Sequence, residues 1–354
     1  MTQYRTQRVV DILHESRDII KVRLDDESRA YCFPQLNGRV EVGNDVVINT
    51  TAIDLNLGTG GWHFIAWNLA HTNVSAPGAG HIMKLRYTPL QIDTGVAEEF
   101  DDWDHTKTSL ENMPVIVAPL HSHIPAITSF LKNQSDQLRI AVIISDGASL
   151  PLALSDTMHQ LKDMGDVTST ITYGHAFGGD IEAINIYTAL LSARHRAQAD
   201  VTIVSMGPGI VGTNTQFGFT GIDVAHQLDA AQTLGGQTFG VLRASQADPR
   251  ERHRGISHHS ITTFSIATQR KHSLALINDH ELTPMMQSQV KESGIDERHS
   301  VINLPSIGIV ELMDDRGLNV SSMGRAAHED PLFFESAAAA AQLALTHITS
   351  SDEN

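Results

Sequence analysis

The sequence predicts an α/β protein in which a doubly wound, mostly parallel, Rossmann-like sheet follows a small all-β barrel or sandwich. The first 95 residues contain short segments rich in Val, Ile and aromatic residues, separated by Gly, Asn and Asp, which is typical of strands and turns. After Pro114, continuous apolar runs alternate with longer amphipathic stretches, as expected for buried parallel strands and their crossover helices. The chain has 354 residues, 41% of them hydrophobic, which is enough for two domains.

The amino-terminal domain is expected to span residues 1–95. Its segments are short, rich in Val, Ile and aromatic residues, and separated by turn-forming residues. The predicted strands lie at residues 8–13, 18–24, 29–34, 39–50, 61–70 and 81–92. Such a series of short strands favours a small barrel or sandwich.

Residues 96–113 are expected to form an acidic linker. Between Gly95 and Met113 the chain carries six acidic residues and one lysine, with little hydrophobic periodicity. A charged segment of this kind tends to stay extended and solvated.

The carboxyl-terminal domain is expected to span residues 114–354. Predicted strands lie at residues 115–120, 138–145, 168–173, 201–206, 238–244 and 273–278, and the clearest helices at 151–164 and 180–198. Repeated strand-then-helix order implies right-handed crossovers and a mostly parallel sheet.

Net charge and cysteine content limit the partners and the compartment. The formal net charge is −16 at pH 7, which argues against nucleic-acid and anionic-membrane partners, because both require a basic surface. With Cys32 as the single cysteine, no intrachain disulfide can form, as is usual in a reducing cytoplasm. The sequence has neither signal-peptide features nor a run of about 18 apolar residues. We therefore expect a cytoplasmic protein, and a homo-oligomer on general grounds.

Polar residues follow five successive predicted strands. Ligands of open parallel sheets bind beyond the carboxyl ends of the strands, so these segments are the natural place for a site. The five segments are residues 121–123, 145–147, 174–180, 207–215 and the stretch that begins at Arg243. Ordinary turn chemistry, which also uses Gly, Asp and Ser, is the alternative explanation.

The segment after the fourth strand contains a GxGxxG pattern. Gly207, Gly209 and Gly212 follow an apolar run, but no helical pattern starts directly after them, so a dinucleotide site of the usual kind is not expected. We expect instead a loop that binds an anion through backbone amides and the hydroxyls of Thr213 and Thr215. A glycine-rich turn that packs against another subunit is the alternative.

The stretch "DPRERHRGISHHS", residues 248–260, is the most basic part of an acidic chain. Its arginines Arg250, Arg252 and Arg254 are candidates to bind a phosphate or carboxylate, since a guanidinium group can bind either in a bidentate way. Salt bridges between subunits are the alternative. The following segment looks like a helix with Ser257 or Ser260 as its cap.

Histidines and one aspartate supply candidate acid–base groups. We expect His175 and either His253 or His258 to transfer protons, because imidazole titrates near neutral pH. Asp146 is expected to orient one of them. Asp180 is expected to cap the next helix.

A metal site and a serine nucleophile are two further readings of the strand ends. His121 and His123 form an HxH pair that, with His175, could bind a divalent metal. The adjacent histidines His258 and His259 are not expected to face one ion from a regular strand. Ser205 and Ser145 lack the glycine that a nucleophile elbow requires, so neither is favoured.

Four motifs together, "APLHSH", "GHAFGGD", "GPGIVGTNT" and "RERHRGISHH", resemble those of a bacterial family catalogued only as a domain of unknown function. The resemblance covers nearly the whole chain, including the β-rich start. It implies no activity, cofactor or catalytic residue, so the functional expectations rest on the residues alone.

Three functions are compatible with these residues. The preferred one is an enzyme, a hydrolase or transferase, that binds a small anionic ligand, phosphorylated ligands included, at the carboxyl edge of the sheet. The second is a metal-dependent hydrolase that uses a histidine cluster. The third is a binding or scaffolding protein that forms a symmetric oligomer. No cofactor is indicated beyond a divalent metal in the second hypothesis.

Overall fold

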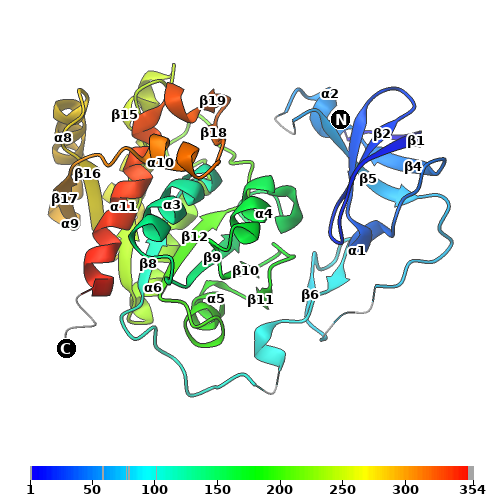
Figure 1. Ribbon diagram of the computed structural model, residues 1–354, viewed down its shortest axis with the longest axis horizontal. Helices are drawn as coiled ribbons and strands as arrows, with labels where there is room; N and C mark the ends of the chain where they lie inside the picture. The colour runs from blue at the N-terminus through cyan, green and yellow to red at the C-terminus, as the bar shows by residue number, and fades with distance from the viewer. Residues whose placement is uncertain (1, 58–59, 77, 79, 101, 350–354) are drawn as a thin grey trace. The chain divides into compact units, whose positions relative to one another are not determined.

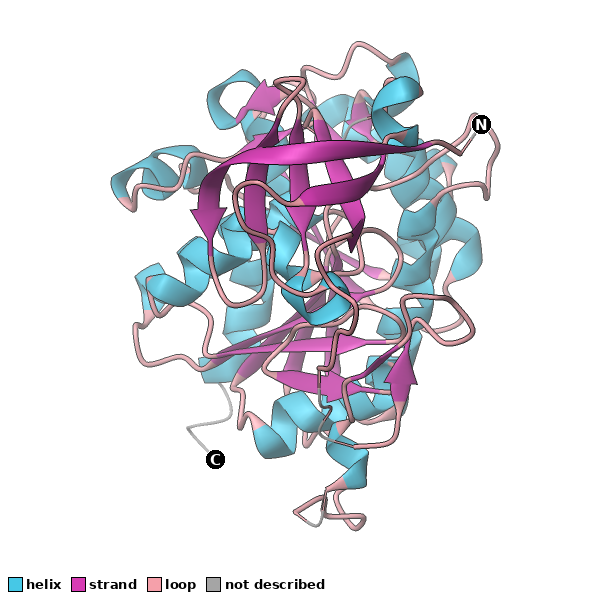
Figure 2. Ribbon diagram, turned by 90° about the vertical axis from the view of Figure 1, so that its right-hand side faces the viewer, coloured by secondary structure: helices cyan, strands magenta, loops and turns pink. Residues whose placement is uncertain are grey.

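The chain divides into two compact units, Met1–Gly95 and Val96–Asn354. The computed structural model describes residues 2–57, 60–76, 78, 80–100 and 102–349. Figure 1 shows the elements of both units with their labels, and Figure 2 shows strands and helices in separate colours.

The first unit is a closed five-stranded barrel with the strand order β1-β2-β3-β5-β4. Neighbouring strands of the barrel are antiparallel, except for β3 and β5, which are parallel. The strands are β1 (Tyr4–Glu15), β2 (Ile20–Leu24), β3 (Arg29–Cys32), β4 (Asp45–Asn49) and β5 (Trp62–Asn68), with short helices α1 (Pro34–Asn37) and α2 (Thr51–Asp54) and the hairpin β6 (Met83–Lys84) and β7 (Ile92–Asp93). The predicted small β-barrel is thus confirmed.

Alternation along the strands explains the barrel core. Ile20, Val22 and Leu24 are buried while the residues between them are not, because successive side chains of a strand point to opposite faces. Cys32 lies in the same core, and burial raises the pKa of its thiol to about 12. The single cysteine is therefore protonated at neutral pH and unsuited to nucleophilic chemistry.

The second unit contains an eight-stranded parallel sheet with the order β11-β10-β9-β12-β8-β13-β16-β17. The strands are β8 (Pro114–Val117), β9 (Ile140–Ser145), β10 (Ser169–Tyr173), β11 (Ile181–Ala183), β12 (Val201–Met206), β13 (Gln237–Gly240), β16 (Ser273–Ile277) and β17 (Ser300–Leu304). All residues of β8, β9 and β12 are buried, as expected for central strands covered on both faces. The α/β prediction is confirmed.

Helices from two groups cover the sheet (Figure 1). One group packs α3 (Ile124–Gln134) and α10 (Ile309–Asp315) on α11 (Pro331–Thr349), which lies against β8, β13 and β16; the other packs α5 (Ile186–Leu191) on α6 (Asp223–Thr233), which also contacts β8 and β13. The remaining helices are α4 (Asp156–Asp163), α7 (His258–Thr262), α8 (Thr283–Glu292) and α9 (Ile295–Arg298). Among all helices of the described chain, none combines the length and apolarity needed to cross a bilayer.

The helix expected over residues 180–198 is wrong in its first part. Residues Ile181–Ala183 form strand β11, which extends the sheet beside β10, and α5 begins at Ile186 with Asn185 as its N-cap. Asp180 caps no helix, because its carboxylate accepts hydrogen bonds from the backbone and hydroxyl of Thr170 (both 2.8 Å). Pairing with a neighbouring strand has overridden the local helical pattern.

The segment expected to be a linker belongs to the second unit. It contains the short helix η1 (Ala97–Glu99). Leu110 is fully buried and donates its N–H to the carbonyl of Leu234 (2.8 Å).

Gly240, the last residue of β13, is in close contact with Phe264 and Leu274. We expect its substitution to destabilise the fold. A Cβ at Gly240 would lie 2.6 Å from Cζ of Phe264 and 2.8 Å from Cδ2 of Leu274. We expect Gly240→Ala to lower the free energy of unfolding by about 1–3 kcal/mol, since overpacking a buried site strains its neighbours. Denaturant unfolding measures this loss. Gly221→Ala is the control, because its Cβ would meet neighbours at 3.5 Å, an ordinary contact.

Candidate functional site

His121 connects three elements at the carboxyl edge of the sheet. It follows β8, its Nδ1 donates to the carbonyl of Met206 at the end of β12 (3.1 Å), and its Nε2 lies 2.6 Å from Oγ of Ser155. Ser155 is the N-cap of α4. Burial lowers the pKa of His121 to about 4. Both ring nitrogens are used in structural hydrogen bonds.

His123 is fully buried and stacks on Phe333 of α11, with ring centroids 4.2 Å apart. Neither ring nitrogen has a hydrogen-bond partner among the described residues. Burial, and then the charge of Arg243, lower the pKa of His123 to about 3. The ring is therefore neutral at pH 7 and packs as an aromatic side chain.

Asp146 and His175 meet where β9 and β10 end. The carboxylate of Asp146 accepts a hydrogen bond from the backbone N–H of His175 (3.0 Å). Asp223, the first residue of α6, has a raised pKa because of burial and then because of the charge of Asp146. The structure thus adds a second carboxyl group that the sequence analysis missed, since an acid in the first turn of a helix is unremarkable by pattern.

Gly207 and Gly209 have structural reasons to be glycine. A Cβ at Gly207 would lie 2.5 Å from the carbonyl oxygen of Ser149, and the Ser149 hydroxyl donates to the carbonyl of Pro208 (2.7 Å). Gly209 has a φ of +104°, a backbone conformation that other residues rarely adopt. This part of the loop is packed against the end of β9.

Gly212 brings the other end of the loop against His259. A Cβ at Gly212 would lie 3.2 Å from Cε1 of that ring. The Thr213 hydroxyl donates to the carbonyl of Gly218 (3.0 Å) and lies 2.8 Å from the hydroxyl of Thr215. Thr213 therefore closes its own loop.

Arg243 follows β13 and is tied to the start of α7 by backbone hydrogen bonds. The strand β14 (Ala244–Ser245) pairs with β15 (Gly255–Ile256). The carbonyl of Arg243 accepts the N–H of Ser257 (2.8 Å), and its own N–H donates to Oγ of Ser260 (2.9 Å). The chain between the two strands forms a loop that begins and ends at this strand pair, so Arg243 lies beside the histidines that follow.

An ionic cluster centred on the buried carboxylate of Asp248 surrounds this arginine. Nη2 of Arg243 lies 3.5 Å from the carboxylate of Asp248, which also pairs with Arg250 (2.8 Å) and Arg325 (3.6 Å). Arg325 contacts Asp330 at 3.3 Å as well. The cluster contains three guanidinium groups and two carboxylates, so one positive charge is in excess.

Arg243 keeps hydrogen-bonding capacity although it is only 2% exposed. Its Nε and Nη2 have no hydrogen-bond partner among the residues that the structure describes. Burial lowers the pKa of Arg243 to about 10, so it remains charged at pH 7. Burial alone would raise the pKa of Asp248, but hydrogen bonds from Arg250 hold it well below its usual range.

Three histidines, His253, His258 and His259, lie together beside Arg243; we call them the histidine triad. His253 ends the turn η6 (Glu251–His253), and the other two begin α7 after its N-cap Ser257, which confirms Ser257 as a cap. Because the adjacent pair starts a helix and not a strand, both rings reach the same place. No part of this group coincides with His121, His123 or His175.

The three predicted clamp arginines lie in different environments. Arg250 donates through Nε and Nη2 to Asp248 (2.9 and 2.8 Å). Arg252 is exposed, and its charge lowers the pKa values of His258 and His259 after the larger effect of burial. Arg254 is exposed. No local motif marked Arg325 as a further member of this region.

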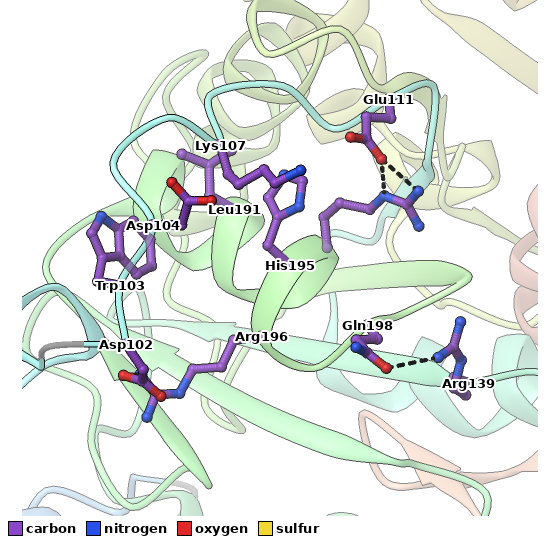
Figure 3. Close-up of a pocket in the computed structure, with 11 residues that line it drawn as sticks. Asp102, Trp103, Asp104, Lys107, Glu111, Arg139, Leu191, His195, Arg196 and Gln198 are labelled. Carbon is purple, nitrogen blue, oxygen red and sulfur yellow. Dashed lines mark hydrogen bonds and ion pairs between the residues drawn. The ribbon is translucent and has the colours of Figure 1, made fainter.

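A pocket of about 610 Å³ opens at the opposite edge of the sheet (Figure 3). It is lined by residues that precede β9 and β12 and by the segment after residue 101. Its arginines are paired, since Arg194 contacts Glu111 (2.7 Å), Arg196 contacts Asp102 (3.1 Å), and Arg139 contacts Asp200 (2.8 Å). These paired charges leave less capacity for an anion than the Arg243 cluster has.

Comparison with protein families agrees with the motifs. The family model DUF3866, described as a protein of unknown function, matches residues 29–341. The chain belongs to the DUF3866 family. The DUF3866 match extends from the barrel to α11 and includes the histidine triad and its ionic cluster. A comparison with curated proteins found no match.

Contacts thus link the strand ends of this DUF3866 protein in a series. His121 connects β8 to β12, Asp146 connects β9 to β10, and Gly212 connects the loop after β12 to the triad after β13. The carboxyl edge carries carboxyl groups at the β9 and β10 side and a buried arginine with imidazoles at the β13 side.

Proposed function

We propose that this DUF3866 protein is an enzyme, a hydrolase or transferase, that binds a small anion at the carboxyl edge of its parallel sheet. The observation that carries the proposal is Arg243, a buried guanidinium with two nitrogens that lack hydrogen-bond partners among the described residues. A buried charge is costly unless it is paired and hydrogen-bonded. An anion beside Arg243 would supply both the charge and the acceptors.

The charge balance around Arg243 favours the same ligand. Asp248 is shared with two other arginines, so it neutralises Arg243 only in part. A phosphate or carboxylate group can accept two parallel hydrogen bonds from one guanidinium. Phosphorylated or carboxylated metabolites are therefore the ligand class that we propose.

We assign proton transfer to the carboxyl groups of Asp146 and Asp223, at the part of the edge where β9 and β10 end. Asp223 has a raised pKa beside Asp146, and a carboxyl group poised nearer to neutral pH is better suited to general acid–base catalysis. His175 lies next to this pair through its backbone contact with Asp146. Burial lowers the pKa of His253 to about 3, so His253 is neutral at pH 7 and too weak a base to be the preferred proton acceptor.

Titration of the metal-free full chain with inorganic phosphate tests the proposal. After EDTA treatment, we expect saturable binding at millimolar concentration and a higher melting temperature, because a ligand that binds only the folded state stabilises it. Arg243→Lys should weaken binding by about tenfold or more, since a lysine cannot replace a bidentate guanidinium. Arg270→Lys, at an exposed arginine of the same unit, is the matched control.

Two outcomes would contradict the proposal. Phosphate, sulfate, acetate and sugar phosphates that all fail to bind would remove its basis, as would unchanged phosphate affinity in a folded Arg243→Lys variant. The scaffolding alternative predicts instead that Arg252→Ala and His253→Ala change the oligomeric state with no change in the response to anions. Light scattering on the same variants measures that state.

A further inference from the structure

The histidine triad brings three imidazoles together from two short segments. One potential ligand nitrogen from each ring lies within 4.8 Å of the other two. The ring centroids of His258 and His259 are 4.2 Å apart, and His253 lies 4.8 and 5.1 Å from them. In a tetrahedral zinc site with Zn–N distances of about 2.0–2.1 Å, ligand nitrogens lie about 3.4 Å apart. The nitrogens of the triad, which lie within 4.8 Å of one another, would have to approach to that spacing when an ion binds.

The triad has lone pairs that the protein does not use. Both ring nitrogens of His259 and Nε2 of His258 are buried and have no hydrogen-bond partner within the described ranges. A buried polar atom without a partner costs about 1–3 kcal/mol, and several such atoms at one point indicate a missing ligand. The polar atoms are all nitrogens of imidazole, which is a common ligand of transition metals.

Neighbouring side chains hold two of the rings in place. Phe219 stacks on His259 with ring centroids 4.0 Å apart and an interplanar angle of 6°. Nδ1 of His253 lies 2.7 Å from Oγ of Ser257, which leaves Nε2 of His253 for a ligand. A hydrogen bond to the second ring nitrogen is the usual way in which a ligating histidine is oriented.

We propose that His253, His258 and His259 bind one transition metal ion, with Zn²⁺ as the best match. Three histidines leave a fourth position open in a tetrahedral site, as in zinc sites that hold a water or a substrate. The all-nitrogen ligand set disfavours Mg²⁺ and Ca²⁺, which prefer oxygen. This site goes beyond the proposed function and does not depend on it.

Arg243 determines what occupies the fourth position. Its backbone is bonded to Ser257 and Ser260, on either side of His258 and His259, so its charge weakens the binding of a bare cation. An anionic fourth ligand, such as hydroxide or a substrate anion, would lie between the metal and the guanidinium and offset that repulsion. Metal and anion are therefore expected to strengthen the binding of each other.

Calorimetry with Zn²⁺ on the EDTA-treated full chain tests the site, without any anion beyond the buffer. We expect one equivalent to bind with a dissociation constant in the micromolar range or below, and Co²⁺ to give the absorption of a tetrahedral complex. His258→Gln should lower the affinity at least 100-fold. His258 is the least buried member of the triad, so this variant is the least demanding on folding, and circular dichroism checks it.

Two further variants make the result decisive. His328→Gln, at a histidine with 65% of its side chain exposed, should keep the full equivalent, because it lies outside the triad. His258→Cys should restore binding and add a thiolate charge-transfer band with Co²⁺. Absence of a Zn²⁺ equivalent in the wild type, or a folded His258→Gln variant with unchanged affinity, would overturn the site. Neither result affects phosphate binding to the metal-free protein, so the two proposals fail separately.

Discussion

Asp248→Asn is expected to lower the free energy of unfolding by about 3–5 kcal/mol, the cost of leaving a buried charge without its partner. The side chain of Asp248 is fully buried, and it faces Arg243, Arg250 and Arg325. Asparagine keeps the size and loses the charge, so the buried Arg243 would lose its carboxylate partner, while Arg325 would keep Asp330. Urea unfolding at neutral pH, monitored by circular dichroism, measures the difference.

Asp102→Asn is the control for this loss. Asp102 pairs with Arg196 at 3.1 Å, but 66% of its side chain is exposed. Exposed ion pairs contribute about 0–1 kcal/mol, so this variant should remain close to the wild type. Equal losses for the two variants would show that the charges around Arg243 are solvated in solution.

Acidification from pH 7 to pH 4 is expected to destabilise the fold, and His123→Phe should reduce this loss by about 3 kcal/mol. The pKa of His123 is about 3 in the folded protein because of burial, compared with about 6.5 in an unfolded chain. Below that value the unfolded state binds more protons, so stability is complete above about pH 6.5 and falls as the pH moves toward 3. Phenylalanine preserves the stack on Phe333 and cannot titrate.

Denaturant unfolding at pH 7, 6, 5 and 4 measures this difference for the wild type and the variant. His105→Gln removes an exposed histidine and should leave the loss as it is in the wild type. A His123→Phe protein that loses as much stability as the wild type would show that His123 is hydrated or paired in solution.

The fold could be predicted where burial is continuous and could not where pairing partners decide. The run at residues 140–145 is buried at every position, and its sequence is apolar up to residue 144, so it indicates a strand by itself. The strands β11 and β17 lie at the two edges of the sheet and have mixed burial. Their sequences have no clear apolar pattern, because each of them has a neighbouring strand on one side only.

The positions of several candidate residues at strand ends could be predicted, but the tertiary contacts that bring others beside them could not. The rule that ligands bind at the carboxyl ends of parallel strands led to Asp146, His175 and the basic stretch after Arg243, all at strand ends in the structure. The position of Arg325 beside Asp248 could not be predicted, because 77 residues separate them in the chain. The meeting of Asp223 with Asp146 depends on tertiary packing in the same way.

The two-residue pairing between β14 and β15 makes residues 246–254 a loop whose two ends are joined by hydrogen bonds. Arg243 lies outside this loop and is held by its backbone hydrogen bonds to Ser257 and Ser260. His253 lies within the loop. Local opening of this loop would remove His253 from the triad and Asp248 from Arg243 together, while the backbone of Arg243 and the other two rings stay attached to α7. An ion in the proposed site would then lose one ligand without unfolding of the sheet.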